Sequence, residues 1–184
     1  MVAPTAVRGI PGLAGLDHVG LTVPDLDAAV SFFVEVIGAD FVYAGDAIGG
    51  RPEDEAFMAE ALDVHPKATC RYSFLRCRNG LNLELFEYSA PDQIRARPRN
   101  SDWGGHHIAL YVDDIHAAVA HLKAHGVRIL GEPMTITTGN SAGASWVYFL
   151  APWGLQMELC SAPRGKAYEA DAPVRLWHPK RPAE

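Results

Sequence analysis

The sequence lacks any long apolar stretch, since no run approaches the roughly 18 residues that a membrane span needs. Hydrophobic residues still make up 48% of the 184 residues and charged residues 21%, which is enough apolar material for a folded core. We therefore expect neither a transmembrane segment nor a chain that is disordered throughout. Residues 1–16 contain no continuous apolar segment either, so we expect no signal peptide.

Basic residues and cysteines are also scarce. The 16 Lys and Arg are outnumbered by 22 Asp and Glu, and the net charge of -6 argues against a nucleic-acid partner and against an anionic membrane surface. The three cysteines, Cys70, Cys77 and Cys160, form no C-x-x-C pair. Their odd number suits reduced thiols in the cytoplasm better than a disulfide framework. The sequence contains no P-loop, dinucleotide-binding glycine fingerprint or nucleophile elbow.

The most informative feature that is present is an internal repeat. The segments His18–Val30 and His107–Val119 are identical at seven of thirteen positions. A second similarity follows in the same order, between Gly80–Leu85 and Gly154–Leu159, with four of six positions identical. Chance similarity of two strand–helix units would not explain why each match contains a polar residue that packing does not require.

Each repeat is expected to form a strand, a helix and then further strands. His18–Val23 and residues 107–112 alternate apolar and polar residues, and Asp25 and Asp114 are the expected helix N-caps. Gly38 and Gly126 would end the helices. Later strands are predicted at residues 71–78, 81–88, 145–150 and 155–160, and a helix outside the repeat at Pro52–Leu62.

The expected organisation is an α+β fold with two tandem modules joined by a linker. We place an N-terminal segment at residues 1–15, the first module at 16–91, the linker at 92–104 and the second module at 105–160. A proline-rich tail follows at residues 161–184, which we expect to be extended with its aromatic side chains docked.

Four polar residues stand out because the repeat pairs them: His18 with His107, and Glu84 with Glu158. Each is predicted to lie on the strand face opposite the apolar, helix-packed face. Two imidazoles and two carboxylates form a suitable ligand set for a divalent metal, and four ligands leave about two positions on a six-coordinate ion. Four unrelated solvent-facing side chains are the alternative, but the pairing favours one metal site.

These residues lie in motifs that resemble the vicinal oxygen chelate superfamily, which includes glyoxalase I, methylmalonyl-CoA epimerase and the extradiol dioxygenases. The motifs are Leu16–Leu21, Leu83–Leu85, Gly105–Asp114 and Gly154–Leu159. The resemblance implies paired βαβββ modules that form a curled, mostly antiparallel eight-stranded cup. It also implies that His18, Glu84, His107 and Glu158 bind one divalent ion, which would be Zn, Ni, Co, Mn or Fe. A homodimer is expected from the resemblance and because curled sheets leave edges that need covering.

The predicted activity is that of a metal-dependent isomerase, epimerase or glyoxalase-type lyase acting on a small molecule. A metal-bound carbonyl makes the neighbouring C–H acidic, and Glu84 or Glu158 could remove that proton. Candidate substrates are hydroxyketones, thioesters and sugar-derived cyclic ketones of the kind used by valiolone epimerases in this superfamily. Residues 67–83 contain no Asp or Glu where methylmalonyl-CoA epimerases place an additional base, which argues against that activity.

Two other classes of function stay open from the sequence. An extradiol dioxygenase needs only two His and one carboxylate, and Glu84 would occupy a position that catechol and O₂ need. A non-catalytic protein that sequesters a drug or metabolite has no use for four ligands. Both features favour the isomerase.

Weaker candidates are expected to be structural. His106 should face the helices. The spacing of His121 and His125 on one helix could bind a metal, but no Glu lies between them, and we expect two surface residues. His65 is either an acid/base group in a loop that enters the cup or a solvated loop residue. Cys160 could face the cup as an inert thiol. Aromatic residues in the strands could line a substrate pocket but most often simply pack; they are Tyr72, Tyr111, Trp146 and Tyr148. The linker arginines could bind a phosphate or carboxylate, but we expect them to be solvated; they are Arg95, Arg97 and Arg99.

Overall fold

The computed structural model describes residues 9–182. The first eight residues lie outside the described residues, and so does that half of the region judged for a signal peptide, as do the last two residues of the tail. The first half of the fold contains, in chain order, β1 (His18–Thr22), α1 (Leu26–Ser31), η1 (Phe32–Ile37), β2 (Asp40–Ala44), β3 (Ile48–Gly49), η2 (Pro52–Asp54), α2 (Glu55–Glu60), β4 (Thr69–Arg76) and β5 (Asn82–Ser89). The second half contains β6 (Ile108–Tyr111), α3 (Ile115–Ala124), β7 (Arg128–Thr135), β8 (Ser145–Leu150) and β9 (Gln156–Ser161), followed by η3 (Ala167–Ala170).

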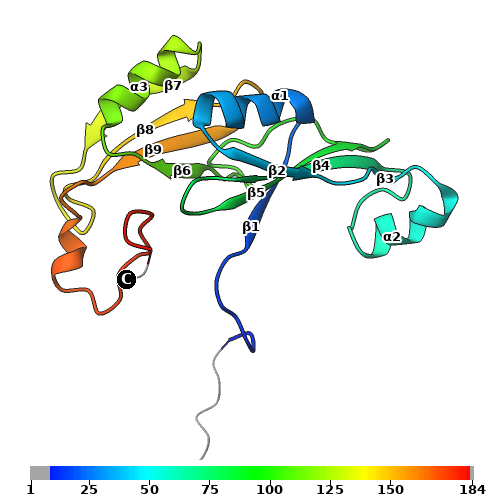
Figure 1. Cartoon of the computed structure of the whole chain (residues 1–184), viewed down its shortest axis with the longest axis horizontal. Helices are drawn as coiled ribbons and strands as arrows, with labels where there is room; N and C mark the ends of the chain where they lie inside the picture. The colour runs from blue at the N-terminus through cyan, green and yellow to red at the C-terminus, as the bar shows by residue number, and fades with distance from the viewer. Residues whose placement is uncertain (1–8, 183–184) are drawn as a thin grey trace, which may run out of the picture.

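Each half forms its own sheet, and the two sheets have the same topology. The strand order is β1-β5-β4-β2 in the first sheet, with the short β3 paired to β4, and β6-β9-β8-β7 in the second. β1 runs parallel to β5 and β6 parallel to β9, while the other pairs are antiparallel. Helices α1 and α3 lie on the same side of the molecule, above the two sheets (Figure 1). The predicted α+β fold of two curled βαβββ units is therefore confirmed.

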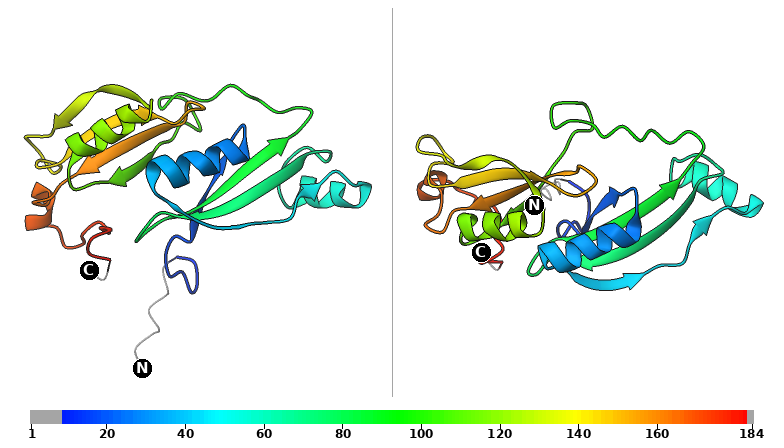
Figure 2. Two further views of the ribbon diagram at one scale, coloured as in Figure 1. Left: turned by 45° about the horizontal axis from the view of Figure 1, so that its top comes forward. Right: turned by 90° about the horizontal axis from the view of Figure 1, so that it is seen from above.

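A single hydrophobic core joins the two halves. It includes residues of both helices and of the sheet faces beneath them, such as Phe33, Leu85, Val119 and Met157. Trp153, in the β8–β9 turn of the second half, packs against Phe32 and Phe33 of the first half, with ring centroids 5.6 and 6.0 Å apart. The halves consequently lie side by side, with their helices adjacent (Figure 2).

The helix ends follow the sequence prediction. The Asp25 side chain accepts a hydrogen bond from the Ala28 N–H at 2.9 Å, and Asp114 accepts two, from the His116 and Ala117 N–H groups, both at 3.0 Å. Gly38 ends the first helix with φ of 83°, in the left-handed region that glycine adopts easily. The prediction did not include the change to π-helical hydrogen bonding over η1, because apolar spacing does not encode it.

The segment between β3 and β4 projects from one end of the molecule (Figure 1). The predicted helix over Pro52–Leu62 is present as η2 and α2, with a 3-10 turn where a continuous helix was expected. Met58 is its buried anchor, and Gly49 lies close to it, where a Cβ would be 2.2 Å from the Ala68 carbonyl oxygen.

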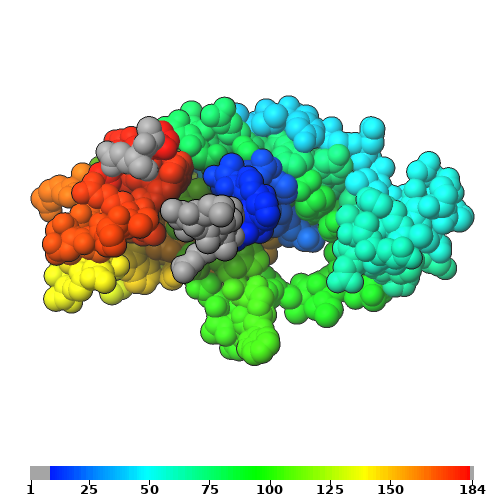
Figure 3. Space-filling model, turned by 90° about the horizontal axis from the view of Figure 1, so that it is seen from below, coloured from blue at the N-terminus to red at the C-terminus, as the bar shows by residue number. Residues whose placement is uncertain are grey.

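The C-terminal tail is docked, as expected, but it is not wholly extended because it contains η3. The Tyr168 hydroxyl accepts a hydrogen bond from the Leu176 N–H, and both Lys180–Asp113 contacts are 2.9 Å. In the same tail, the Trp177 side chain packs over Gly80 in the β4–β5 turn. Seen from below, the tail covers the second half, and α2 lies at the opposite end (Figure 3). The tail therefore connects the second half to a hairpin of the first.

All three cysteines are free thiols, in agreement with the expected absence of a disulfide framework. None of the helices between residues 9 and 182 is long and apolar enough to cross a membrane.

Candidate metal centre

The first predicted His–Glu pair is formed across the parallel strands β1 and β5. His18 Nε2 lies 3.1 Å from a Glu84 carboxylate oxygen, and His18 Nδ1 lies 2.8 Å from Asp17 Oδ2. The hydrogen bond to Asp17 raises the pKa of His18, and the charge of Glu84 acts in the same direction. Glu84 is largely shielded, with 16% of its side chain exposed, whereas Asp17 is 87% exposed. We call this group the first half-site.

The second pair repeats this geometry in the second half. His107 Nε2 lies 3.0 Å from a Glu158 carboxylate oxygen, and His107 Nδ1 lies 3.2 Å from Asn100 Oδ1. The other oxygen of Glu158 accepts a hydrogen bond from the Cys160 thiol at 3.0 Å. Burial, followed by this contact with Glu158, raises the pKa of Cys160 to about 12. We call this group the second half-site.

The strand register explains why the two half-sites match. Glu84 is opposite Gly20 and Glu158 is opposite Ala109, and each histidine lies two residues before that partner. Side chains two residues apart on a strand share a face, so each histidine reaches its glutamate diagonally. The apolar neighbours Leu83, Leu85, Met157 and Leu159 are buried on the opposite face.

An aromatic ring supports each histidine edge-on. The ring centroids of His18 and Phe74 are 5.5 Å apart, and those of His107 and Tyr148 are 5.2 Å apart. Phe74 is opposite Glu84 and Tyr148 is opposite Glu158 on the neighbouring strands. Tyr148 was a sequence candidate, whereas Phe74 was missed. Its position ten residues before Glu84, matching Tyr148 and Glu158, was a signal that could have revealed it.

Both half-sites have the chemistry expected of metal ligands. Each offers an imidazole nitrogen and a carboxylate oxygen about 3 Å apart, which is the separation of neighbouring ligands on an ion with bonds of about 2.1 Å. The other nitrogen of each imidazole is held by an oxygen acceptor, as is usual for a metal-binding histidine. The residues therefore fit a divalent metal in their type and mutual geometry.

The four predicted ligands are brought together as two pairs and not as one cluster. Within residues 9–182, no group of three or more His, Cys, Asp or Glu side chains is arranged to hold a metal ion. Each half-site thus provides half of the predicted ligand set.

Comparison with known proteins agrees with this arrangement of strands. Residues 15–159 match the model of the Glyoxalase/Bleomycin resistance protein/Dioxygenase superfamily. The chain belongs to this superfamily. It is 53% identical over 176 residues to a 2-epi-5-epi-valiolone epimerase from Actinomyces sp., a match that covers 94% of this chain and 93% of the relative. It is also 30% identical to human mitochondrial methylmalonyl-CoA epimerase, with 76% of this chain and 68% of the relative covered.

A solved structure shows the same fold. A glyoxalase family protein from Bacillus cereus has a TM-score of 0.62, with 24% identity, and the match covers 81% of this chain and 94% of that one. Both relatives named above are epimerases, and the chain is an enzyme of the vicinal oxygen chelate type.

The weaker histidine candidates of this superfamily member bond groups outside the two half-sites. His106 is exposed and bonds the Gly104 carbonyl oxygen at 3.0 Å, so the prediction that it faces the helices is wrong. His121 Nε2 is 2.9 Å from the Val36 carbonyl oxygen, a contact that helps to join the halves, and His125 bonds the His121 carbonyl oxygen. His65 lies in the loop before β4, where it accepts the Lys67 N–H.

The candidate arginines and aromatics also have identifiable surroundings. Arg99 forms an ion pair with Asp102 at 2.9 Å, and Arg97 lies against Gly154. Tyr72 contacts Phe74 and Phe86, and Trp146 packs on Tyr148. All three of these aromatic contacts lie on the sheet faces that carry the half-sites.

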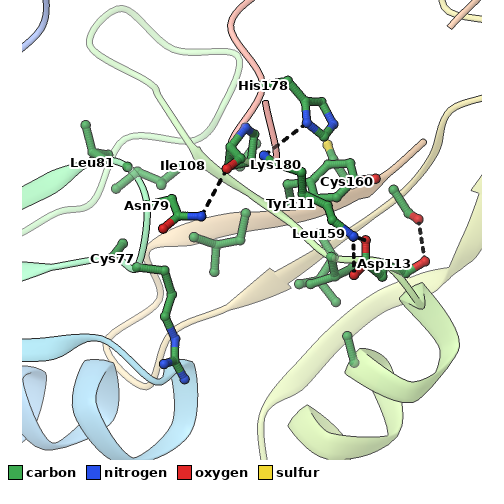
Figure 4. Close-up of a pocket in the computed structure, with 18 of the residues that line it drawn as sticks. Cys77, Asn79, Leu81, Ile108, Tyr111, Asp113, Leu159, Cys160, His178 and Lys180 are labelled. Atoms are coloured by element: carbon green, nitrogen blue, oxygen red, sulfur yellow. Dashed lines mark hydrogen bonds and ion pairs between the residues drawn. The ribbon is translucent and has the colours of Figure 1, made fainter. Parts of the chain in front are cut away.

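A cavity of about 650 Å³ lies between the two halves and the tail, a volume that suits a small ligand. Figure 4 shows Tyr111 and Cys160 beside His178 and Lys180 from the tail, and the ring centroids of Tyr111 and His178 are 4.3 Å apart. None of the four predicted ligands lines this cavity. Cys160 connects the two regions, because it lines the cavity and also donates its hydrogen bond to Glu158.

Proposed function

We propose that this enzyme is a metal-dependent epimerase of a sugar-derived cyclic ketone related to 2-epi-5-epi-valiolone. The observation that carries the proposal is the 53% identity to an epimerase of that compound over nearly the full length of both chains. The two half-sites support it, because epimerisation beside a ketone requires a proton to be removed and returned.

The metal would be held by His18, Glu84, His107 and Glu158, and when bound it would act as a Lewis acid that makes the C–H beside the substrate carbonyl more acidic. One of the two carboxylates, Glu84 or Glu158, would remove that proton from one face of the carbon, and a proton that has exchanged with solvent would be added at the opposite face. General-base help of this kind is typically worth about 10²–10⁴-fold. Phe74 and Tyr148 hold the imidazoles in place and keep water from one side of each.

Other activities of the superfamily are less well supported. Residues 67–83, which form β4 and the following turn, contain no acidic side chain for the additional base predicted for methylmalonyl-CoA epimerases. A dioxygenase needs open positions for both catechol and O₂, and four protein ligands leave about two in total. The presence of all four ligands also distinguishes the chain from a binding protein without chemistry.

We further propose that each complete metal site is shared between two chains. The support is that one chain holds the ligands as two separate pairs, and that the sheet faces carrying them both lie opposite the helices (Figure 1). Two chains meeting through these faces would place the first half-site of one chain against the second half-site of its partner. A homodimer would then contain two equivalent sites. We place this enzyme in the cytoplasm, in keeping with its free thiols.

Incubation with 2-epi-5-epi-valiolone in D₂O tests the activity. We expect the epimer to form with deuterium at one carbon, without consumption of O₂, and we expect a chelator to stop the reaction and an added divalent metal to restore it. A Gln substitution at the base should lower kcat far more than metal affinity, whereas a substitution at a purely ligating glutamate should lower both. Oxygen uptake with a catechol, or turnover that survives complete removal of metal, would contradict the proposal.

A further inference from the structure

The two half-sites differ in the group that holds Nδ1 of the histidine. In the first, that group is Asp17, the residue immediately before His18. In the aligned position of the repeat, the residue before His107 is His106, which turns away to the Gly104 carbonyl oxygen. Asn100, seven residues before His107, provides the acceptor instead.

The direction of these hydrogen bonds determines which nitrogen of each imidazole carries a proton. Carboxylate and amide oxygens only accept, so Nδ1 of each ring carries the proton and donates it. Nε2 then faces a carboxylate oxygen 3.0–3.1 Å away. The positive group at this contact is either a proton on Nε2 or a metal ion that replaces it, and Nδ1 keeps its proton in both states. An oxygen acceptor on Nδ1 therefore prepares Nε2 to bind a metal ion.

The loop that carries Asn100 has a compact and well-determined shape. The Asp102 carboxylate accepts the Arg99 backbone N–H at 2.8 Å and also pairs with the Arg99 guanidinium. The Gly105 N–H bonds the Asp102 carbonyl oxygen at 2.8 Å, and a Cβ on Gly105 would lie 2.1 Å from the Arg99 carbonyl oxygen. These contacts fix the backbone on both sides of Asn100, which is itself exposed. Burial raises the pKa of Tyr148, the aromatic partner of His107, and the nearby Asn100 amide lowers it in part.

We propose that Asn100 is a positioning residue of the second half-site and that the loop at residues 99–105 places it against His107. It fixes the tautomer and the ring orientation of His107, as Asp17 does for His18. This inference rests on the proposed function in taking His107 as a metal ligand. It assigns a role to a linker that the sequence predicted to be merely solvated.

The test measures Zn²⁺ affinity with a competing chelator for the full-length protein and for Asn100→Ala, Asn100→Asp and Ser101→Ala. Loss of an outer partner of a metal-binding histidine typically lowers metal affinity by about 10–100-fold, and we expect this for Asn100→Ala. Asn100→Asp keeps an oxygen acceptor and should retain the affinity. Ser101→Ala changes an exposed side chain of the same loop and is the matched control.

A second measurement, on the metal-free protein, tests the hydrogen bond by itself. Nitrogen-15 NMR of the histidines should show His107 protonated at Nδ1 in the wild type, and this preference should disappear in Asn100→Ala. Unchanged Zn²⁺ affinity in Asn100→Ala, with strong loss in His107→Ala, would overturn the role of Asn100 and leave the proposed function standing. Unchanged Zn²⁺ affinity in His107→Ala would instead show that His107 is not a metal ligand, which would contradict the proposed function as well.

Discussion

At the residue scale, Glu87 shows how one carboxylate can support two elements. Its side chain accepts the Leu26 N–H at the start of α1 at 2.9 Å and pairs with Arg71 on β4 at 2.6 Å. The hydrogen bond from Leu26 is the main reason that the pKa of Glu87 lies below its usual value of 4.5, and the Arg71 contact lowers it further. Because the pKa is lowered in the folded state, Glu87 stabilises the fold above about pH 4.5, and this contribution is lost as the pH falls through the lowered pKa.

We therefore expect Glu87→Gln to reduce the free energy of unfolding by about 1 kcal/mol at pH 7, since the side chain is partly exposed. Urea unfolding at pH 7 and then at decreasing pH measures this, and the difference from wild type should shrink below about pH 4.5. Glu60→Gln, on the exposed face of α2, is the control and should have little effect at either pH. A difference that stays constant down to pH 3 would contradict the assignment.

Sequence reasoning at this scale succeeds where the repeat carries the information. The faces of His18, Glu84, His107 and Glu158 follow from strand alternation, and the structure forms both predicted His–Glu pairs. Asn100 could not be predicted in the same way. It belongs to the linker, outside the repeat, and its distance from His107 depends on the turn closed by Asp102 and Gly105.

At the element scale, helix α3 depends on its N-cap. Asp114 accepts two of the N–H groups that would otherwise lack partners at the start of the helix, and Val119 and Leu122 then pack into the core. Asp114→Ala should lower the free energy of unfolding by about 1 kcal/mol, whereas Asp114→Asn should keep most of the cap. Urea unfolding measures both. Equal stability of Asp114→Ala and wild type would show that tertiary packing alone fixes the helix.

The caps and the main strands could be predicted because they depend on neighbouring residues. The π-helical η1 and the η3 turn of the tail could not, since they depend on distant contacts such as those of Phe32 with Trp153 and of Glu169 with Arg181. Local sequence therefore determined the arrangement of each half, while the junction and the tail required the whole fold.

At the scale of the whole molecule, one chain has features of an incomplete assembly. The edge strand β2 exposes Phe41, Val42 and Tyr43, with exposed fractions of 50%, 54% and 48%. Apolar edge strands of this kind normally pair with or are covered by another element. Together with the separate half-sites, this supports the proposed dimer.

Mixing two inactive variants distinguishes a shared site from a site within one chain. In a heterodimer of His18→Ala and His107→Ala chains, a shared arrangement places both changes in one site and leaves the other site intact. Random pairing should then restore about a quarter of the wild-type activity and metal content. Half of the dimers are mixed, and one of the two sites in each mixed dimer has all four ligands. Either variant alone should stay inactive. Co-expressed chains that recover no activity would contradict shared sites.

The position of Trp153 also has an optical consequence. Its indole belongs to the second half but rests against Phe32 and Phe33 of the first, whereas Trp103 is fully exposed to water. An indole in apolar contact emits at shorter wavelength than one in water, so Trp153 is a built-in fluorescent reporter of whether the halves are docked. A variant in which the other three tryptophans, Trp103, Trp146 and Trp177, are replaced by Phe would leave Trp153 as the only emitter. Separation of the halves would then be visible as a red shift before either sheet unfolds.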